Sequence, residues 1–219
     1  MGRMPRLTVP GYPHHITQRG GRRQPVFFSD SDYKMYVDIL AAEKDSADVE
    51  IWAYCLMPNH VHVIATPENK DGLSRCFRVA HREYARRINK REGWQGHLWQ
   101  ERFYSAVLDE RYLMAAVRYT ELNPVRAGLC RHPGEWRWSS VHAHITGTSD
   151  RLVNVEPMAN RVTDWQKYLN VPESSSVIEE IRLHSRTGRP VGSDYFVGKL
   201  EDQLGVTLRK RKPGPKPRN

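Results

Sequence analysis

Two apolar, β-branched stretches separated by a short turn constrain the fold of this chain more than any other feature. Residues 49–56 (VEIWAYCL) and 60–66 (HVHVIAT) have the composition of buried strands, and Met57-Pro58-Asn59 between them has the composition of a turn. A connection this short joins antiparallel neighbours. The sequence therefore predicts a β-hairpin and, with it, an antiparallel sheet.

The flanking segments place this hairpin in an alternating order of strands and helices. Strands are expected at 12–19 and 103–108, and helices at 31–45, 73–90 and 110–123, from apolar spacing and N-capping residues. The expected order is β-α-β-β-α-β-α. It predicts an α+β domain of the ferredoxin-like type, in which helices cover a single antiparallel sheet.

His60 and His62 lie at the turn end of the third predicted strand. Side chains alternate between the two faces of a strand, so both imidazoles point one way while Val61 and Val63 point the other. Two imidazoles side by side on a rigid strand form half of a metal site. The alternative is the polar face of a half-exposed strand that carries two histidines without such a role.

The helix expected at 110–123 carries a second pair, Tyr119 and Asn123, which are four residues apart and would share a helix face. A phenol with its ordinary pKa of about 10 needs help to act as a nucleophile. A divalent metal held by two imidazoles and one amide oxygen would supply that help by polarising a target phosphate. Tyr119 would then form a covalent intermediate. The alternative is a buried helix tyrosine followed by a helix cap.

The charge of the chain indicates a polyanionic partner. The 219 residues include 34 Lys and Arg against 25 Asp and Glu, a net charge of +9, and such an excess in a soluble protein most often indicates nucleic acid. Candidate phosphate contacts occur in a glycine-flanked loop, on the helix at 73–90 and in the tail, namely Arg22, Arg23, Arg78, Arg82, Arg86, Arg209, Lys210, Arg211 and Lys212. The alternatives are a solvated loop, a solvated helix face and a solubilising tail.

Compartment and domain organisation follow from what surrounds these motifs. Three cysteines without C-x-x-C spacing favour a reducing, cytoplasmic compartment. We expect no signal peptide and no membrane partner, because no apolar run approaches the ~18 residues of a membrane span. Small polar residues at 146–150 predict a boundary between a catalytic domain (1–145) and a basic, mainly helical or irregular extension (146–219). Helices are expected there at 174–185 and 194–204.

The segments MPNHVH and RYTELNPVRAGL, which contain His60, His62 and Tyr119, resemble the single-tyrosine HUH transposases. HUH denotes histidine, a hydrophobic residue and histidine, and Val61 occupies the middle position. The closer resemblance is to the REP-associated tyrosine transposases of bacteria. It extends over about residues 12–143, through HHITQRG, FFSDSDY, LWQERFYSAVL and WRWSSVHAH, and the segment around Arg189 resembles their tail.

This resemblance implies an HUH-type catalytic domain with Mg²⁺ or Mn²⁺ as cofactor. It implies cleavage and rejoining of single-stranded DNA next to palindromic hairpins through a 5′-phosphotyrosine, as in DNA transposition. His60 and His62 would be metal ligands, Tyr119 the nucleophile, and Asn123 would stand where relatives place a glutamine as third ligand. Arg126 and Arg189 join the residues expected at DNA. A monomer or weak dimer associated with the bacterial nucleoid is implied.

Two further functions remain open on the sequence. One is a non-enzymatic binder of palindromic DNA or structured RNA that uses the same sheet and basic surface. The other is a metal-dependent hydrolase that uses the histidine pair without a covalent step. A labelled single-stranded hairpin incubated with Mn²⁺ separates the three: a covalent adduct indicates the transposase, cleavage without an adduct the hydrolase, and binding without cleavage the binder.

Overall fold

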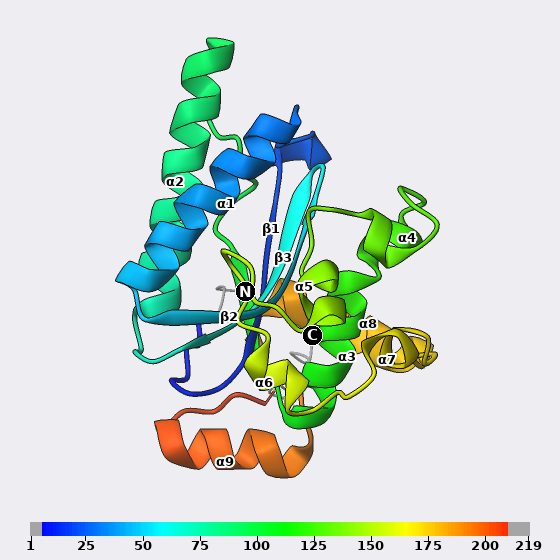
Figure 1. The fold of residues 1–219 in the computed structure, drawn as a ribbon. Helices are drawn as coiled ribbons and strands as arrows, with labels where there is room; N and C mark the ends of the chain where they lie inside the picture. The colour runs from blue at the N-terminus through cyan, green and yellow to red at the C-terminus, as the bar shows by residue number, and fades with distance from the viewer. Residues whose placement is uncertain (1–5, 210–219) are drawn as a thin grey trace, which may run out of the picture.

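The structure, a computed structural model that describes residues 6–209, is built around one antiparallel sheet (Figure 1) of four strands. Its strands are hydrogen-bonded in the order β2-β3-β1-β4, and every neighbouring pair is antiparallel. Their bounds are β1 (His14–Arg19), β2 (Val49–Met57), β3 (His60–Pro67) and β4 (Tyr104–Val107). This order of strands is that of a ferredoxin-like sheet.

Three helices complete the predicted order of elements. They are α1 (Asp30–Ser46) between β1 and β2, α2 (Gly72–Glu92) between β3 and β4, and α3 (Glu110–Glu121) after β4. Each expected element is present, with ends that differ by only a few residues. The α+β, ferredoxin-like β-α-β-β-α-β-α prediction is therefore confirmed.

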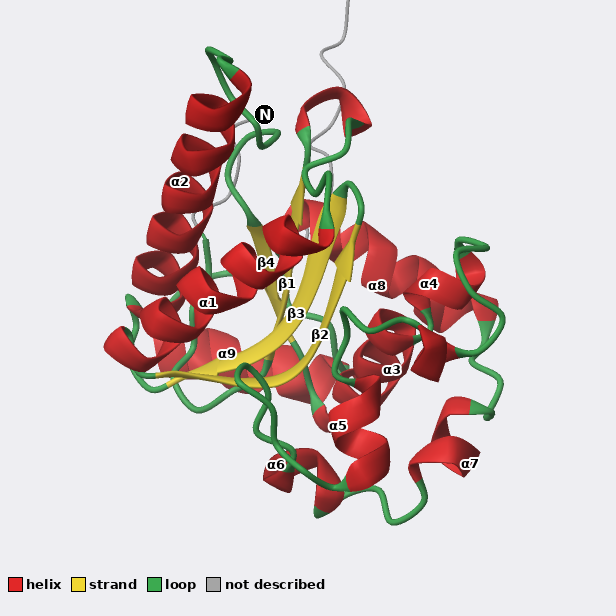
Figure 2. Ribbon diagram, turned by 45° about the horizontal axis from the view of Figure 1, so that its top comes forward, coloured by secondary structure: helices red, strands yellow, loops and turns green. Residues whose placement is uncertain are grey.

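Helices cover both faces of the sheet (Figure 2). On one face, α1 and α2 pack over a core that includes Ile16, Val61 and Val63. On the other, α3 and α8 (Ser175–Thr187) pack against each other and the sheet, over a core that includes Ala53 and Ile64. Strand alternation directs His60 and His62 to this second face, as predicted.

A two-residue turn, Pro58-Asn59, joins β2 to β3, since Met57 pairs with His60. The loop that follows β1 is fastened onto this turn, because Val26 N–H donates to the Pro58 carbonyl and Gly20 N–H to the Asn59 carbonyl, both at 2.8 Å. Gly20 has to be glycine, since a Cβ there would lie 2.3 Å from the Gln24 carbonyl oxygen. The loop therefore holds the start of β3, where His60 lies, against the end of β1.

Short helices make up most of the rest. They are the 3₁₀ turns η1 (Gly21–Arg23) and η2 (Pro133–Glu135) and the helices α4 (Asn123–Arg126), α5 (Val141–Thr146), α6 (Glu156–Ala159), α7 (Trp165–Leu169) and α9 (Asp194–Leu204). Helix α9 is capped at both ends: Ser193 accepts from Phe196 N–H, and Gly205 is left-handed with φ 65°. Within residues 6–209, no helix has both the length and the apolarity to cross a bilayer.

The C-terminal region is mainly helical, as expected, and it is not remote from the sheet. Helix α8 contacts β1, β4 and α3. Its apolar residues Val177 and Ile181 belong to the same buried cluster as Leu113 and Val117 of α3. The division into domains at residue 145 stays a prediction.

Candidate active site

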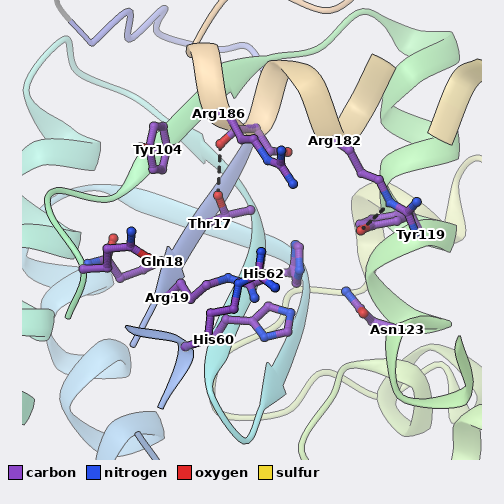
Figure 3. A pocket seen from close by; sticks show the side chains of 13 residues that line it. Thr17, Gln18, Arg19, His60, His62, Tyr104, Tyr119, Asn123, Arg182 and Arg186 are labelled. Atoms are coloured by element: carbon purple, nitrogen blue, oxygen red, sulfur yellow. Dashed lines mark hydrogen bonds between the residues drawn. The ribbon is translucent and has the colours of Figure 1, made fainter. Parts of the chain in front are cut away.

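A cavity of about 530 Å³ lies on the sheet face that α3 and α8 cover (Figure 3). The four residues that the sequence singled out for metal binding and nucleophilic attack all line it: His60, His62, Tyr119 and Asn123. They come from β3, α3 and α4, so the fold brings together residues about sixty positions apart. Their roles stay predictions.

The rings of His60 and His62 meet edge to face, with 5.0 Å between the ring centroids and 77° between their planes. His60 Nδ1 bonds the Asn59 side-chain oxygen at 2.6 Å, and His62 Nδ1 bonds His15 Nε2 at 2.8 Å. In the part of the chain that the structure describes, neither Nε2 atom has a hydrogen-bond partner. The Nε2 lone pairs are therefore available to a metal ion.

Burial keeps both rings neutral. Burial, together with the smaller effect of the positive charge of Arg19, lowers the pKa of His60 to about 3. The pKa of His62 lies well below its ordinary value for the same first reason, with the neighbouring histidines and arginines adding to it. Neutral imidazole is the form that binds a metal ion.

Tyr119 projects from α3 toward the histidines. Its ring meets the His62 ring edge to face, with 5.6 Å between the centroids. Two guanidinium groups flank it: that of Arg126 lies over the ring at 4.3 Å, and Arg182 Nε donates to the phenol oxygen at 3.4 Å. This leaves the phenol next to a candidate metal site and among cations that suit a phosphate.

The prediction that Tyr119 and Asn123 lie on one helix is wrong in one detail. Asn123 does not continue the helix of Tyr119, because α3 ends at Glu121 and Asn123 begins α4. The reason is Pro124, which has no N–H to donate to the carbonyl four residues earlier, so the helical ladder is interrupted. Leu122 N–H still bonds the Arg118 carbonyl, so the chain turns on with little deviation, and both side chains reach the cavity.

The donors in the cavity fit a divalent cation. Among residues 6–209 no group of three or more His, Cys, Asp and Glu side chains is placed to hold a metal, so two imidazoles need another ligand. The Asn123 Nδ2 atom is buried without a partner. Amide N and O positions are assigned from their partners, and the opposite assignment places an oxygen there. Two imidazole nitrogens and one amide oxygen leave positions for phosphate oxygens and water.

The cations expected at DNA occupy several places. Arg23 lines the cavity that His60 and Tyr119 also line, and its exposed neighbour Arg22 shares its left-handed backbone. Arg78 and Arg82 line a second cavity of about 460 Å³, whereas Arg86 is bound to Glu83 on the exposed side of α2.

The C-terminal cations hold the end of the described chain. Arg189 donates to the Leu208 carbonyl, and Arg209 donates to the Asp194 carbonyl at 2.9 Å and pairs with Glu201. Lys210, Arg211 and Lys212 lie outside the described residues. DNA contact by any of these cations stays a prediction.

The sequence analysis missed several residues of the cavity. Helix α8 contributes Arg182, Ser185 and Arg186, and β1 contributes Arg19 and positions His15 behind His62. The signal for the α8 residues was present, since they are three and four positions apart and share one helix face. Nothing in that spacing indicated which part of the fold this face would meet.

Comparison with known proteins places these features in context. Residues 8–123, more than half of the 219, match the family model of IS200-like transposases. The REP-associated tyrosine transposase of Escherichia coli K12 is 25% identical over 116 residues, which cover 52% of this chain and 68% of that protein. A Haemophilus influenzae protein described as a REP-associated tyrosine transposase is 25% identical over 107 residues, covering 44% of this chain but only 61% of the relative.

A solved structure shares the fold. It is that of a REP-associated tyrosine transposase bound to a REP hairpin, and it superposes with a TM-score of 0.58 at 22% sequence identity. The match covers 71% of this chain and 93% of the other. The two chains therefore share a fold over most of their length.

Proposed function

This chain belongs to the family of IS200-like transposases, and on that basis we propose that it cleaves and rejoins single-stranded DNA next to palindromic hairpins through a 5′-phosphotyrosine. One observation carries the proposal: the centroid of the Tyr119 ring lies 5.6 Å from that of the His62 ring, in a cavity that His60 also lines. A nucleophile and two neutral imidazoles then face the same space, which is what attack on an activated phosphate requires.

The proposed substrate is hairpin DNA with a flanking single strand. The relative of known structure was bound to a REP hairpin, and the charge in the cavity of this chain suits such a ligand. Arg19, Arg23, Arg182 and Arg186 all line that cavity. Phosphates of the strand to be cut would meet these guanidinium groups, whose planar donors match phosphate oxygens.

Tyr119 would carry the chemical step. His60, His62 and Asn123 would hold Mg²⁺ or Mn²⁺, which when bound polarises the scissile phosphate and stabilises the leaving oxygen. The Tyr119 phenol oxygen bonds to phosphorus as the bond from phosphorus to the 3′ oxygen breaks. The phenol proton passes to water, and the 3′ oxygen takes up a proton to become a hydroxyl. Arg182, which donates to the phenol oxygen, would offset the negative charge that develops there.

Rejoining reverses these bonds. A 3′-hydroxyl, from the same or another DNA end, attacks the phosphotyrosine, the bond from phosphorus to the Tyr119 oxygen breaks, and the phenol regains a proton. Because the energy of the phosphodiester is retained in the covalent intermediate, no nucleoside triphosphate is consumed.

A labelled single-stranded hairpin oligonucleotide incubated with Mn²⁺ tests the proposal. We expect a protein–DNA adduct that survives denaturation and that Tyr119→Phe abolishes. Tyr112→Phe is the matched control, because Tyr112 also lies on α3 but does not line the cavity. Its adduct should form normally.

Other outcomes select the other functions. Cleavage without an adduct would indicate a hydrolase that uses the histidine pair alone. Binding without cleavage would indicate a DNA- or RNA-binding protein. An adduct that persists in Tyr119→Phe would place the nucleophile elsewhere.

A further inference from the structure

His62 is the last member of a hydrogen-bonded chain of side chains that begins in the C-terminal region. The Oγ atom of Ser185, on α8, is 3.0 Å from His15 Nδ1, and His15 Nε2 is 2.8 Å from His62 Nδ1. The rings of His15 and His62 are stacked, with 5.1 Å between centroids and 17° between planes. His15 is 1% exposed and His62 6%, so water does not compete for the bond between the two rings.

The donor and acceptor in each of these hydrogen bonds follow from the fact that the Ser185 hydroxyl has only one proton. The Ser185 hydroxyl donates to the Ile181 carbonyl at 2.6 Å, so toward His15 it can only accept. The proton of His15 is then on Nδ1, and its Nε2 is an acceptor. His62 must donate from Nδ1 to that acceptor. The His62 Nε2 atom, which faces the cavity, is left with a lone pair.

His60 is held as the same Nδ1–H tautomer by residues close to it in sequence and in the neighbouring loop. Its Nδ1 donates to the Asn59 side-chain oxygen at 2.6 Å. That amide is oriented in turn by its NH₂ group, which donates to the Arg23 carbonyl at 2.9 Å. The tautomer of His60 is therefore set within the hairpin and its neighbouring loop, whereas that of His62 depends on α8.

We propose that Ser185 and His15 are positioning residues that hold His62 as its Nδ1–H tautomer, so that binding of a divalent cation at His62 depends on the docking of α8. The inference rests on the proposed function, in which His62 is a metal ligand. The inference extends beyond the proposed function, since Ser185 lies outside the residues 8–123 that match the family model. Partners that orient a ligating histidine in this way typically change metal affinity by roughly 10–100-fold.

Nitrogen-15 NMR of the histidine side chains in the full-length, metal-free protein tests the tautomer directly. We expect His62 to be protonated on Nδ1 and bare on Nε2. In Ser185→Ala, the His15 proton loses its acceptor, and we expect His62 to become a mixture of tautomers. Ser185→Thr retains a hydroxyl that bonds the Ile181 carbonyl and should restore the original spectrum. A single Nε2–H tautomer for His62 in the unsubstituted protein would overturn the proposal.

A titration with Mn²⁺, followed by electron paramagnetic resonance, gives the second readout without DNA or turnover. Ser185→Ala and His15→Phe, which keeps the stacked ring but removes the acceptor, should both bind Mn²⁺ roughly 10–100-fold more weakly. Ser185→Thr should bind normally. Ser176→Ala is the matched control, because Ser176 lies on the same helix and is exposed.

The outcomes separate the two proposals. If Mn²⁺ broadens the signals of neither His60 nor His62 in the unsubstituted protein, the metal site is wrong, and the proposed function fails with it. If Mn²⁺ binds at these histidines but equally well in Ser185→Ala and His15→Phe, the positioning role alone is overturned.

Discussion

The buried carboxylate of Glu121 holds the helix that carries Tyr119, and its replacement by glutamine should destabilise the protein strongly. Glu121 is fully buried and accepts three hydrogen bonds: from Ser140 at 2.5 Å, from His144 Nδ1 at 2.6 Å and from Trp165 Nε1 at 2.8 Å. These bonds join α3 to α5, to α7 and to the residue before α5. Glutamine has nearly the same shape, so the substitution leaves no cavity and isolates the polar effect.

The expected cost follows from this geometry. Two of the three donors would keep an oxygen, but a neutral one, and each charge-assisted bond would weaken by about 1 kcal/mol. The remaining donor would face the amide NH₂ group, and a buried donor without a partner costs about 1–3 kcal/mol. We therefore expect the free energy of unfolding to fall by about 4 kcal/mol. For a chain of this length that corresponds to a fall in Tm of roughly 8–16 °C.

Urea titration and thermal melting of the full-length protein measure this change. Glu110→Gln is the control, because Glu110 lies on the same helix and pairs with Arg161 but is 63% exposed. An exposed pair of this kind contributes about 0.2–1 kcal/mol. A loss of stability in Glu121→Gln no larger than in Glu110→Gln would refute the reasoning that the buried network holds α3 in place.

Three further predictions concern the site, the buried histidines and the tail. His60→Ala or His62→Ala should abolish metal-dependent cleavage while leaving hairpin binding measurable by gel shift, and full cleavage by either variant would exclude the metal assignment. Burial lowers the pKa of His14 to about 4 and of His81 to about 3. Since only the unfolded chain binds these protons near pH 6, the free energy of unfolding should be level above pH 7. Below pH 6.5 it should fall by about 1.4 kcal/mol per pH unit for each histidine. Urea titrations that stay level down to pH 5 would contradict this. Removal of residues 210–219 should weaken hairpin binding, and flatten its salt dependence, more than it slows single-turnover cleavage; equal losses of both would assign the tail a part in the chemistry.

Local sequence patterns were sufficient for the elements of the fold. The alternation in HVHVIAT placed Val61 and Val63 in the core and the histidines on the opposite face. The helices expected at 174–185 and 194–204 are present as α8 and α9, and in each the serine before the first helical residue, Ser174 or Ser193, accepts a bond from the N–H three residues later. These patterns succeed because backbone geometry repeats every two residues in a strand and every 3.6 in a helix, whatever the rest of the chain does.

At Pro124 the local structure departs from the i, i+4 spacing. The i, i+4 spacing placed Tyr119 and Asn123 on one helix, although the proline next to Asn123 removes the bond that would continue it. The helix ends at Glu121, and the chain turns on into α4. Both side chains nevertheless line the same cavity.

The sequence by itself determined the strands, the helices and the residue types of the candidate site, His60, His62, Tyr119 and Asn123. Only the tertiary structure decided what surrounds them. His15 bonds a histidine 47 positions away, and Ser185 bonds His15 across 170 positions. Such contacts depend on how α8 packs on the sheet, and no local periodicity encodes that packing. For this reason the histidine pair was evident in the sequence, whereas the side chains that orient it were not.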